Sequence, residues 1–375
     1  MPEPPGLSFR PAAHATDGTG AAPLGCYPAP MNDHPHLDLV IVGAGPIGLE
    51  AAIGAKRAGL RYLVLDKGPV VSAIARYPTY MTFFTTSERL EIGGHPLVTA
   101  TDKATRKEAL DYYRKVVQNE ALQVRTFTEV RRLEPRAAGA GFDVHTRDER
   151  GAAATLHARA VMLATGYFDN PKRLGVAGED LPHVSHYFDE AHPHYGRDVT
   201  IVGAGSSAAD AALDLHRAGA RVTMVHRGAD FRHSLKYWIR PNLENRVKEG
   251  SISAHFHSVV REITDDAVVI DKHPPGRPTQ RIRIPTQRTF LLTGYVASPE
   301  LLHQAGVRTE PETFAAELDP DTFETNVPGL YCIGSAGFGN RTSDVFIENG
   351  LVHAERALVH LLARLAAPAD AATPR

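Results

Sequence analysis

Three glycines near residue 45 have the spacing that a phosphate-bearing cofactor requires. Gly43, Gly45 and Gly48 form the pattern G-x-G-x-x-G between an apolar run at 37–42 and a helical pattern. In such a strand–turn–helix unit the first glycine permits the tight turn, the second lets a pyrophosphate approach the backbone, and the third lets helix and strand pack closely. The helix N-terminus adds unpaired N–H groups and the positive end of its dipole. Asp66 ends the next apolar run, where a carboxylate can accept hydrogen bonds from ribose hydroxyls.

The same unit occurs a second time in the chain. An apolar run at 199–202 leads into the spacing G-x-G-x-x-A of Gly203, Gly205 and Ala208. A helix is then expected over about 207–218, before a further strand. Because a repeated strand–turn–helix unit indicates that the same type of binding site occurs twice, the sequence predicts two dinucleotide-binding sites.

The two units end in opposite chemistry. Where the first has Asp66, the second has His226 and Arg227, and Arg232 follows. An acid favours a free ribose 2′-hydroxyl, whereas basic side chains favour a 2′-phosphate. One charge-assisted hydrogen bond is worth roughly 1.5–3 kcal/mol, enough to prefer NADPH over NADH by about 10- to 100-fold. We therefore expect FAD at the first unit and NADPH at the second.

Later segments are expected to contact the first nucleotide. A strand at 160–163 ends in Ala164-Thr165-Gly166, where small residues let the backbone pass close to a dinucleotide. Strands at 290–294 and 329–334 are expected to return to the first domain. The helix expected at 346–365 could face a flavin with its N-terminus, where its dipole would stabilise negative charge on the reduced ring.

The remaining segments are less regular. A helix is expected within 97–122, with Thr101-Asp102 as its candidate cap. The segment 230–250 indicates a surface helix anchored by Trp238, the only tryptophan. Short strands are expected at 124–127, 142–145, 155–158, 267–271 and 280–284.

The composition limits the class of protein. With 43% hydrophobic and 22% charged residues over 375 positions, the chain is expected to form two or three globular domains. A formal net charge of −2 gives no general attraction to nucleic acid or anionic lipid, and no apolar run reaches the roughly 18 residues of a membrane span. Cys26 and Cys332 are the only cysteines, which excludes a disulfide scaffold and fits a reducing cytoplasm. Cys332 is expected to be a buried small hydrophobe.

These motifs together resemble a known group of enzymes. Two nucleotide units, an ATG strand and the C-terminal runs GLYCIG and FIENG are similar to flavoproteins of the thioredoxin reductase type, over about 37–365. Within that type the chain most resembles the bacillithiol-disulfide reductase family. The matching runs are YPTYMTFFTTSERLEIG at 77–93, YWIRPNLENRVKEGS at 237–251 and VFIENG at 345–350.

The resemblance implies a fold and a reaction. The fold is α/β, with two Rossmann-like dinucleotide-binding domains, the NADPH domain being inserted in the FAD domain. The reaction passes a hydride from NADPH to flavin and electrons on to a small disulfide in the cytoplasm. No nucleic-acid or membrane partner is expected, and a homo-oligomer is a family-level expectation only.

The expected domain bounds follow from these motifs. The Pro-, Gly- and Ala-rich start predicts a disordered tail at 1–35, and one hypothesis is that translation begins at Met31. The FAD-binding domain is expected in two segments, 36–193 and 289–368, on either side of the NADPH-binding domain at 194–288. A C-terminal tail is expected at 369–375.

No catalytic residue and no metal ligand are assigned from the sequence. Family patterns add Val130, which is expected over the adenine, to the residues of the two units. The predicted cofactor-binding residues are Gly43, Gly45, Pro46, Ile47, Gly48, Asp66, Lys67, Val130, Ala164, Thr165, Gly166, Gly203, Gly205, Ser206, Ser207, His226, Arg227, Arg232, Gly294, Gly334, Ser335, Phe346 and Ile347.

Three departures from the related patterns bear on the mechanism. The segment before the second unit, HVSHYFDEAHPHYGRDV, lacks the CxxC of thioredoxin reductases. Ile47 stands where bacillithiol-disulfide reductases typically have a cysteine, and Gly334-Ser335 stands where many flavoproteins have Gly-Asp. We therefore expect the flavin to reduce the disulfide directly, without a thiol relay.

Four histidines precede the second unit, namely His183, His186, His192 and His194. Their spacing is not a zinc pattern, and a linker between domains is the favoured interpretation. One of them could donate a proton to a leaving thiolate, because histidine titrates near neutral pH.

Three alternatives stay open at this point. A flavin-dependent monooxygenase would carry F-x-G-x-x-x-H-x-x-x-[YW] between the two units, and that pattern is absent. A ferredoxin–NADP reductase also lacks CxxC but needs a basic face for an acidic ferredoxin. A flavin-binding sensor has little need of the second nucleotide unit.

Overall fold

The computed structural model describes residues 36–232, 235–342 and 344–366 of the 375-residue chain. The predicted tails at 1–35 and 369–375, with Met31 and Cys26, lie outside the described residues. No helix of the described segments is long and apolar enough to cross a membrane.

The first sheet has seven strands in the order β3-β2-β1-β6-β5-β4, and β15 also pairs with β6. Strands β4 to β6 form an antiparallel meander, and the other pairs are parallel. The bounds are β1 Leu37–Val42, β2 Tyr62–Leu65, β3 Val124–Arg125, β4 Thr128–Pro135, β5 Phe142–Asp148, β6 Ala153–Leu163 and β15 Leu330–Cys332.

Strand β6 joins the parallel and antiparallel regions of this sheet. Its first half, up to Ala158, pairs with β5, whereas its second half lies between β1 and β15. The two short runs expected at 155–158 and 160–163 are therefore one continuous strand. This continuity sets the ATG that follows it against the first glycine unit.

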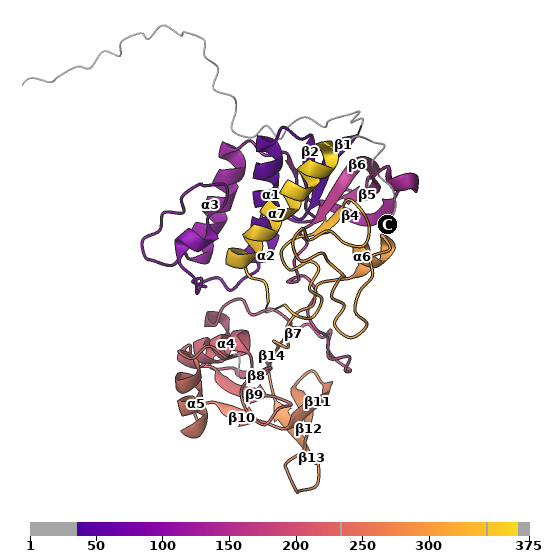
Figure 1. The fold of residues 1–375 in the computed structure, drawn as a ribbon. Helices are drawn as coiled ribbons and strands as arrows, with labels where there is room; N and C mark the ends of the chain where they lie inside the picture. The colour runs from indigo at the N-terminus through magenta and orange to yellow at the C-terminus, as the bar shows by residue number, and fades with distance from the viewer. Residues whose placement is uncertain (1–35, 233–234, 343, 367–375) are drawn as a thin grey trace, which may run out of the picture. The chain divides into compact units, whose positions relative to one another are not determined.

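Helices α1 (Pro46–Arg57), α3 (Arg106–Asn119) and α7 (Ile347–Ala366) lie over the same face of this sheet (Figure 1). Strand β1 is buried on both faces, as expected of a central parallel strand. Leu39 and Ile41 pack under these helices, and Val40 and Val42 pack into a separate cluster on the other face. The shorter helical elements are α2 Ser72–Ala75, η1 Ser87–Leu90, η2 Ala137–Gly139 and α6 Glu300–Gln304.

The expected cap of the helix within 97–122 was wrong. Helix α3 is capped by Thr105, whose hydroxyl accepts from the Glu108 N–H at 3.2 Å while the Glu108 carboxylate accepts from the Thr105 N–H at 2.8 Å. The helix cannot begin at Thr101, because the Ala104 carbonyl accepts a hydrogen bond from the Phe83 N–H at 2.9 Å in an extended pairing.

The second sheet has five parallel strands in the order β10-β9-β8-β14-β7, and helices α4 (Ser206–Arg217) and α5 (Arg240–Lys248) pack in its core cluster. Its bounds are β7 Val184–Ser185, β8 Asp198–Val202, β9 Arg221–Val225, β10 Ser253–His255 and β14 Arg288–Leu291, with η3 at His192–His194. A separate antiparallel sheet contains β11 Ser258–Ile263, β12 Ala267–Lys272 and β13 Gln280–Pro285.

The strand expected at 290–294 does not return to the first domain. It is β14, which pairs with β8 through Phe290 and Leu291 opposite Ile201 and Val202. β14 also pairs with β7, which precedes the expected boundary at 193. Phe290 and Leu291 are 2% and 1% exposed and pack into the two clusters on either side of the second sheet, and this burial explains why the strand belongs to that sheet.

The capping box gives a stability prediction. Replacing Thr105 by Ala removes a side-chain acceptor at the helix start and should lower the free energy of unfolding by about 1 kcal/mol. Urea denaturation measures the change. Thr101→Ala is the matched control, because the Thr101 hydroxyl donates only to the carbonyl of Lys103; equal losses for the two variants would contradict the cap.

Candidate functional site

The first glycine unit is a turn that only glycine can form. Gly43 has a φ of +112°, and a Cβ there would lie 2.4 Å from the Ala164 carbonyl oxygen. A Cβ on Gly48 would lie 2.0 Å from the Gly43 carbonyl oxygen. At Gly45 a Cβ would meet no atom within 4 Å, so the start of α1 faces open space. This is a cradle of the size and polarity that a pyrophosphate fills.

Asp66 has a role that the sequence did not reveal. Its carboxylate accepts from the Ala44 N–H at 2.7 Å and from the Gly68 N–H at 2.8 Å. Burial raises the pKa of this carboxyl, although the two backbone hydrogen bonds oppose the shift. Asp66 therefore holds the glycine turn in place, and a ribose would use the lone pairs that remain.

The side chain of Ile47 packs against the start of α7. Its Cδ1 lies 2.7 Å from the place a Cβ would take on Gly334 and 2.5 Å from the same place on Gly350. Both glycines are needed because the isoleucine side chain occupies that space. Ile47 thus packs the first turn of α1 against α7 and the loop after β15.

The second unit repeats this geometry with opposite charge. Gly203 has a φ of +140°, and its Cβ would lie 2.3 Å from the Leu292 carbonyl oxygen. The Cδ of Arg232 lies 4.0 Å from the place of a Cβ on Gly205. A cationic side chain therefore lies against the second glycine, next to the start of α4.

Lys172 joins this basic group and was missed from the sequence. Burial lowers its pKa, as do the positive charges of Arg232 and Arg227. Within the described residues none of these three cations forms an ion pair. Lys172 belongs to the segment after the ATG, and its backbone N–H donates a hydrogen bond to the Gly294 carbonyl at 2.9 Å. No local pattern marks it, because only the fold brings this segment to the second unit.

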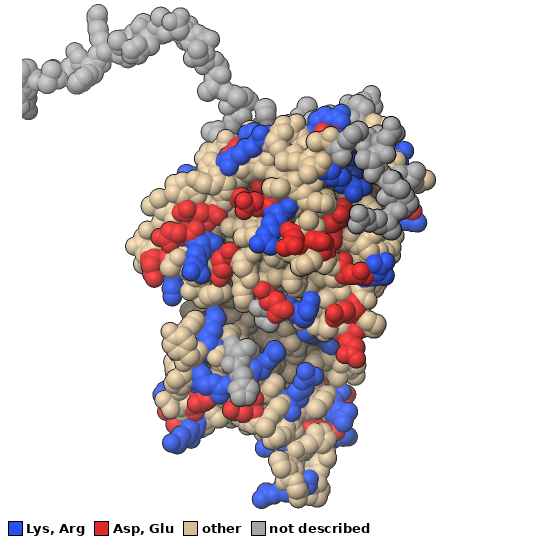
Figure 2. Space-filling model, viewed as in Figure 1, with Lys and Arg blue, Asp and Glu red and all other residues tan. Residues whose placement is uncertain are grey.

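The two units open into one cavity of about 2240 Å³. All the predicted cofactor-binding residues except Gly48 line it. Figure 2 shows a hollow on the visible face, with Lys and Arg side chains gathered beside it. Single-ligand pockets measure roughly 300–1,000 Å³, so this cavity has room for two dinucleotides.

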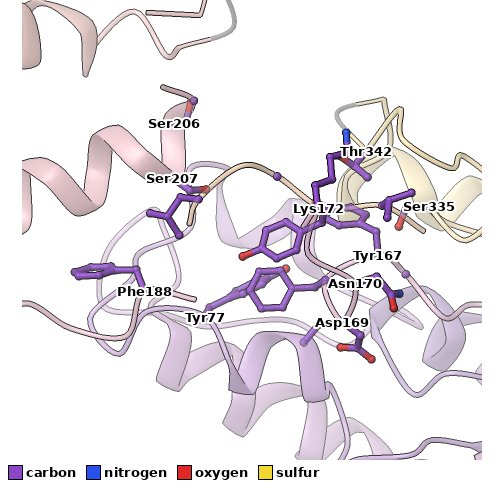
Figure 3. Close-up of a pocket in the computed structure, with 18 of the residues that line it drawn as sticks. Tyr77, Tyr167, Asp169, Asn170, Lys172, Phe188, Ser206, Ser207, Ser335 and Thr342 are labelled. Atoms are coloured by element: carbon purple, nitrogen blue, oxygen red, sulfur yellow. The ribbon is translucent and has the colours of Figure 1, made fainter. Parts of the chain in front are cut away.

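Aromatic side chains form a wall of this cavity. The ring of Phe168 lies 4.9 Å from that of Tyr77 and 4.6 Å from that of Tyr295, centroid to centroid. Figure 3 shows Tyr77 in the lining, with Ser206 and Ser207 of the second unit and Ser335 of the loop after β15. Burial raises the pKa of both tyrosines, so the wall stays neutral.

The predicted residue Lys67 lines the cavity but has a partner of its own. Its ammonium lies 2.7 Å from the Asp169 carboxylate, which also pairs with Arg76. The Arg76 guanidinium lies over Phe168, 5.7 Å from the ring centroid. These contacts fix the aromatic wall to the first unit.

The thiol of Cys332 lies in the core, whereas one of the histidines before the second unit reaches the cavity. Cys332 is fully buried, as expected, and burial raises the pKa of its thiol to about 12. Burial also lowers the pKa of His186 and of His194, whereas His192 lines the cavity. Among the described residues, no group of three or more His, Cys, Asp or Glu side chains is placed to hold a metal ion.

Two glycine cradles that open into one cavity define a flavin oxidoreductase that uses FAD and NADPH. The chain belongs to the pyridine nucleotide-disulphide oxidoreductase family, whose sequence profile matches residues 40–334. It is 39% identical to bacilliredoxin reductase Bdr of Bacillus subtilis, over 84% of this chain and 94% of that protein.

Solved structures agree with this assignment. The bacillithiol disulfide reductase Bdr (YpdA) from Bacillus cereus is 37% identical, with a TM-score of 0.84 over 88% of this chain and 100% of that one. The corresponding Staphylococcus aureus structure is also 37% identical, with a TM-score of 0.81 over 88% and 99%. The predicted fold class, enzyme class and cofactors are therefore confirmed.

The glycine geometry predicts two opposite outcomes. Gly45→Ala should fold, because the added methyl meets open space, but it should bind FAD weakly, because that methyl fills the cradle. Gly48→Ala should lose the fold through its clash with Gly43. Far-UV circular dichroism and the flavin absorbance of the purified protein separate the two effects. Full flavin content in Gly45→Ala would contradict the placement of the pyrophosphate.

The basic group predicts coenzyme selectivity. Arg227→Ala and Lys172→Met should each raise the KM for NADPH about tenfold and leave the KM for NADH unchanged, because only NADPH carries the 2′-phosphate. Arg173→Met is the matched control, because Arg173 is already paired with Asp180 at 2.6 Å. Equal changes for both coenzymes would show that the group does not read the phosphate.

Proposed function

We propose that this protein is an NADPH-dependent reductase of a low-molecular-weight thiol disulfide, with bacillithiol disulfide as its substrate. The relatives named as bacillithiol disulfide reductases support the substrate. The low cysteine content favours a reducing cytoplasm as the location. A homo-oligomer is proposed on the family resemblance alone.

One observation carries the mechanism, namely that no reactive thiol of the described residues lines the cavity. Cys332 is the only cysteine among them, and its side chain is buried in the core of the first sheet. Its raised pKa keeps it protonated, whereas nucleophilic attack on a disulfide needs a thiolate. The electrons therefore reach the disulfide without a relay through any thiol of the described residues.

The overall reaction balances without a further reactant: NADPH, one proton and the disulfide give NADP⁺ and two thiols. When bound, FAD supplies the two-electron relay between the nicotinamide and the disulfide. The chain contributes position and charge. Arg227, Arg232 and Lys172 would hold the 2′-phosphate of NADPH, and the positive end of the α7 dipole would stabilise negative charge on a reduced flavin.

His192 is the candidate proton donor to the leaving thiolate. Of the four neighbouring histidines it alone lines the large cavity. His194 is 8% exposed and packs against Phe290, so it has no path to a substrate in this cavity.

To test the function, NADPH and bacillithiol disulfide are added to an anaerobic sample of the protein. Steady oxidation of NADPH, with two thiols formed per NADPH and no partner protein, is expected. Ferredoxin and oxygen, offered separately, test the two enzymatic alternatives. Absence of turnover with the disulfide would overturn the proposal, and rapid reduction of ferredoxin or hydroxylation with oxygen would then identify the alternative function.

A cysteine-free variant tests the absence of a thiol relay. Cys26→Ser combined with Cys332→Ala should keep turnover with the disulfide within about twofold of the parent, because neither thiol takes part in the reaction. Flavin content and thermal stability of the variant control for its folding. A correctly folded, flavin-loaded variant without disulfide turnover would show that one thiol is needed.

A further inference from the structure

Three large aromatic side chains stay exposed together at the cavity. Phe84, Trp238 and Phe346 are 40%, 53% and 41% exposed, and all three line the cavity. The rings of Phe84 and Phe346 meet edge to face, with centroids 5.6 Å apart. They come from three distant segments, so the fold and not local sequence gathers them. Exposed apolar clusters of this kind mark binding sites.

A cation joins this cluster. The Lys236 ammonium lies 4.8 Å from the ring centroid of Phe84 and 5.6 Å from that of Trp238. Lys236 forms no ion pair within the described residues, and its charge is felt by Asp210 on α4. A second cation, Lys103, lines the same cavity. The cluster therefore combines flat apolar faces with a positive charge that has no direct counter-ion among the described side chains.

The cluster lies beside the first nucleotide unit. Phe346 directly precedes α7, whose first turns pack on Ile47 of the glycine turn through Gly350. Lys236 and Trp238 come from the segment that leads into α5 and the core of the second sheet. Anything bound on the cluster would contact both nucleotide-binding domains of the enzyme.

We propose that Lys236, Phe84, Trp238 and Phe346 form the subsite for one carboxylate-bearing arm of the disulfide substrate. This inference rests on the proposed function. The ammonium of Lys236 pairs with the carboxylate, since a charge-assisted contact is the strong kind of hydrogen bond. The aromatic faces pack against the apolar portion of the same arm.

The cofactor phosphates are not the better occupants of this subsite. Arg227, Arg232 and Lys172 already gather at the second unit, where Arg232 lies against Gly205. The starts of α1 and α4, at the two glycine turns, would receive the pyrophosphates. Among the described residues, Lys236 has neither a glycine turn nor other cations as neighbours, and its ammonium lies near the rings of Phe84 and Trp238. This environment suits an organic anion better than a phosphate.

The test compares Lys236→Met with Lys248→Met, a control on the exposed end of α5. At saturating NADPH, Lys236→Met should lower kcat/KM for bacillithiol disulfide about tenfold through KM, and Lys236→Arg should restore most of it. Trp238→Leu and Phe84→Leu should each raise the same KM severalfold. Flavin content and circular dichroism verify that each variant is folded.

Two further readouts separate the subsite from other roles. With bis(2-hydroxyethyl) disulfide, which has no charge, Lys236→Met should equal the parent, and the KM for NADPH should stay within twofold with ferricyanide as acceptor. A raised KM for NADPH, or an equal loss with the uncharged disulfide, would overturn the subsite while the proposed function stands. A parent enzyme that turns over no bacillithiol disulfide would remove the proposed function and the subsite with it.

Discussion

The structure depends on the close backbone approach at the first glycine turn. The ends of β1 and β6 meet there, because the Ala164 N–H donates to the Val42 carbonyl at 2.8 Å and Gly43 leaves no space for a side chain. Gly48 brings α1 onto the same turn. With turn and helix fixed in this way, the N–H groups of the helix start are held facing a cavity instead of being buried.

The two cradles share this geometry and differ in charge. At the first, Asp66 directs its carboxylate to the backbone of the turn, so two backbone N–H groups stabilise its negative charge. At the second, three cations lie together with no ion pair to any described side chain. Such a group is costly until an anion binds, which favours a phosphorylated nucleotide on that side.

No thiol of the described residues lines the cavity between these cradles. Its wall is built from neutral aromatic rings, and the Cys332 side chain is buried in the core. Ile47 packs between Gly334 and Gly350 and makes this side of the site apolar. The redox chemistry would then rest on the cofactors, and the protein would supply their positions and the charges around them.

The sequence by itself determined the two glycine units, the buried central strands and the opposite charges of the two strand ends. These features are local, because a turn, a helix start and a run of apolar residues each depend on a few residues that are neighbours in the sequence. Only the tertiary structure decided that β14 belongs to the second sheet, that Lys172 joins Arg227 and Arg232, and that Phe84 lies against Lys236 and Phe346. Those contacts join segments far apart in the chain, and the burial that selects them exists only once the chain has folded.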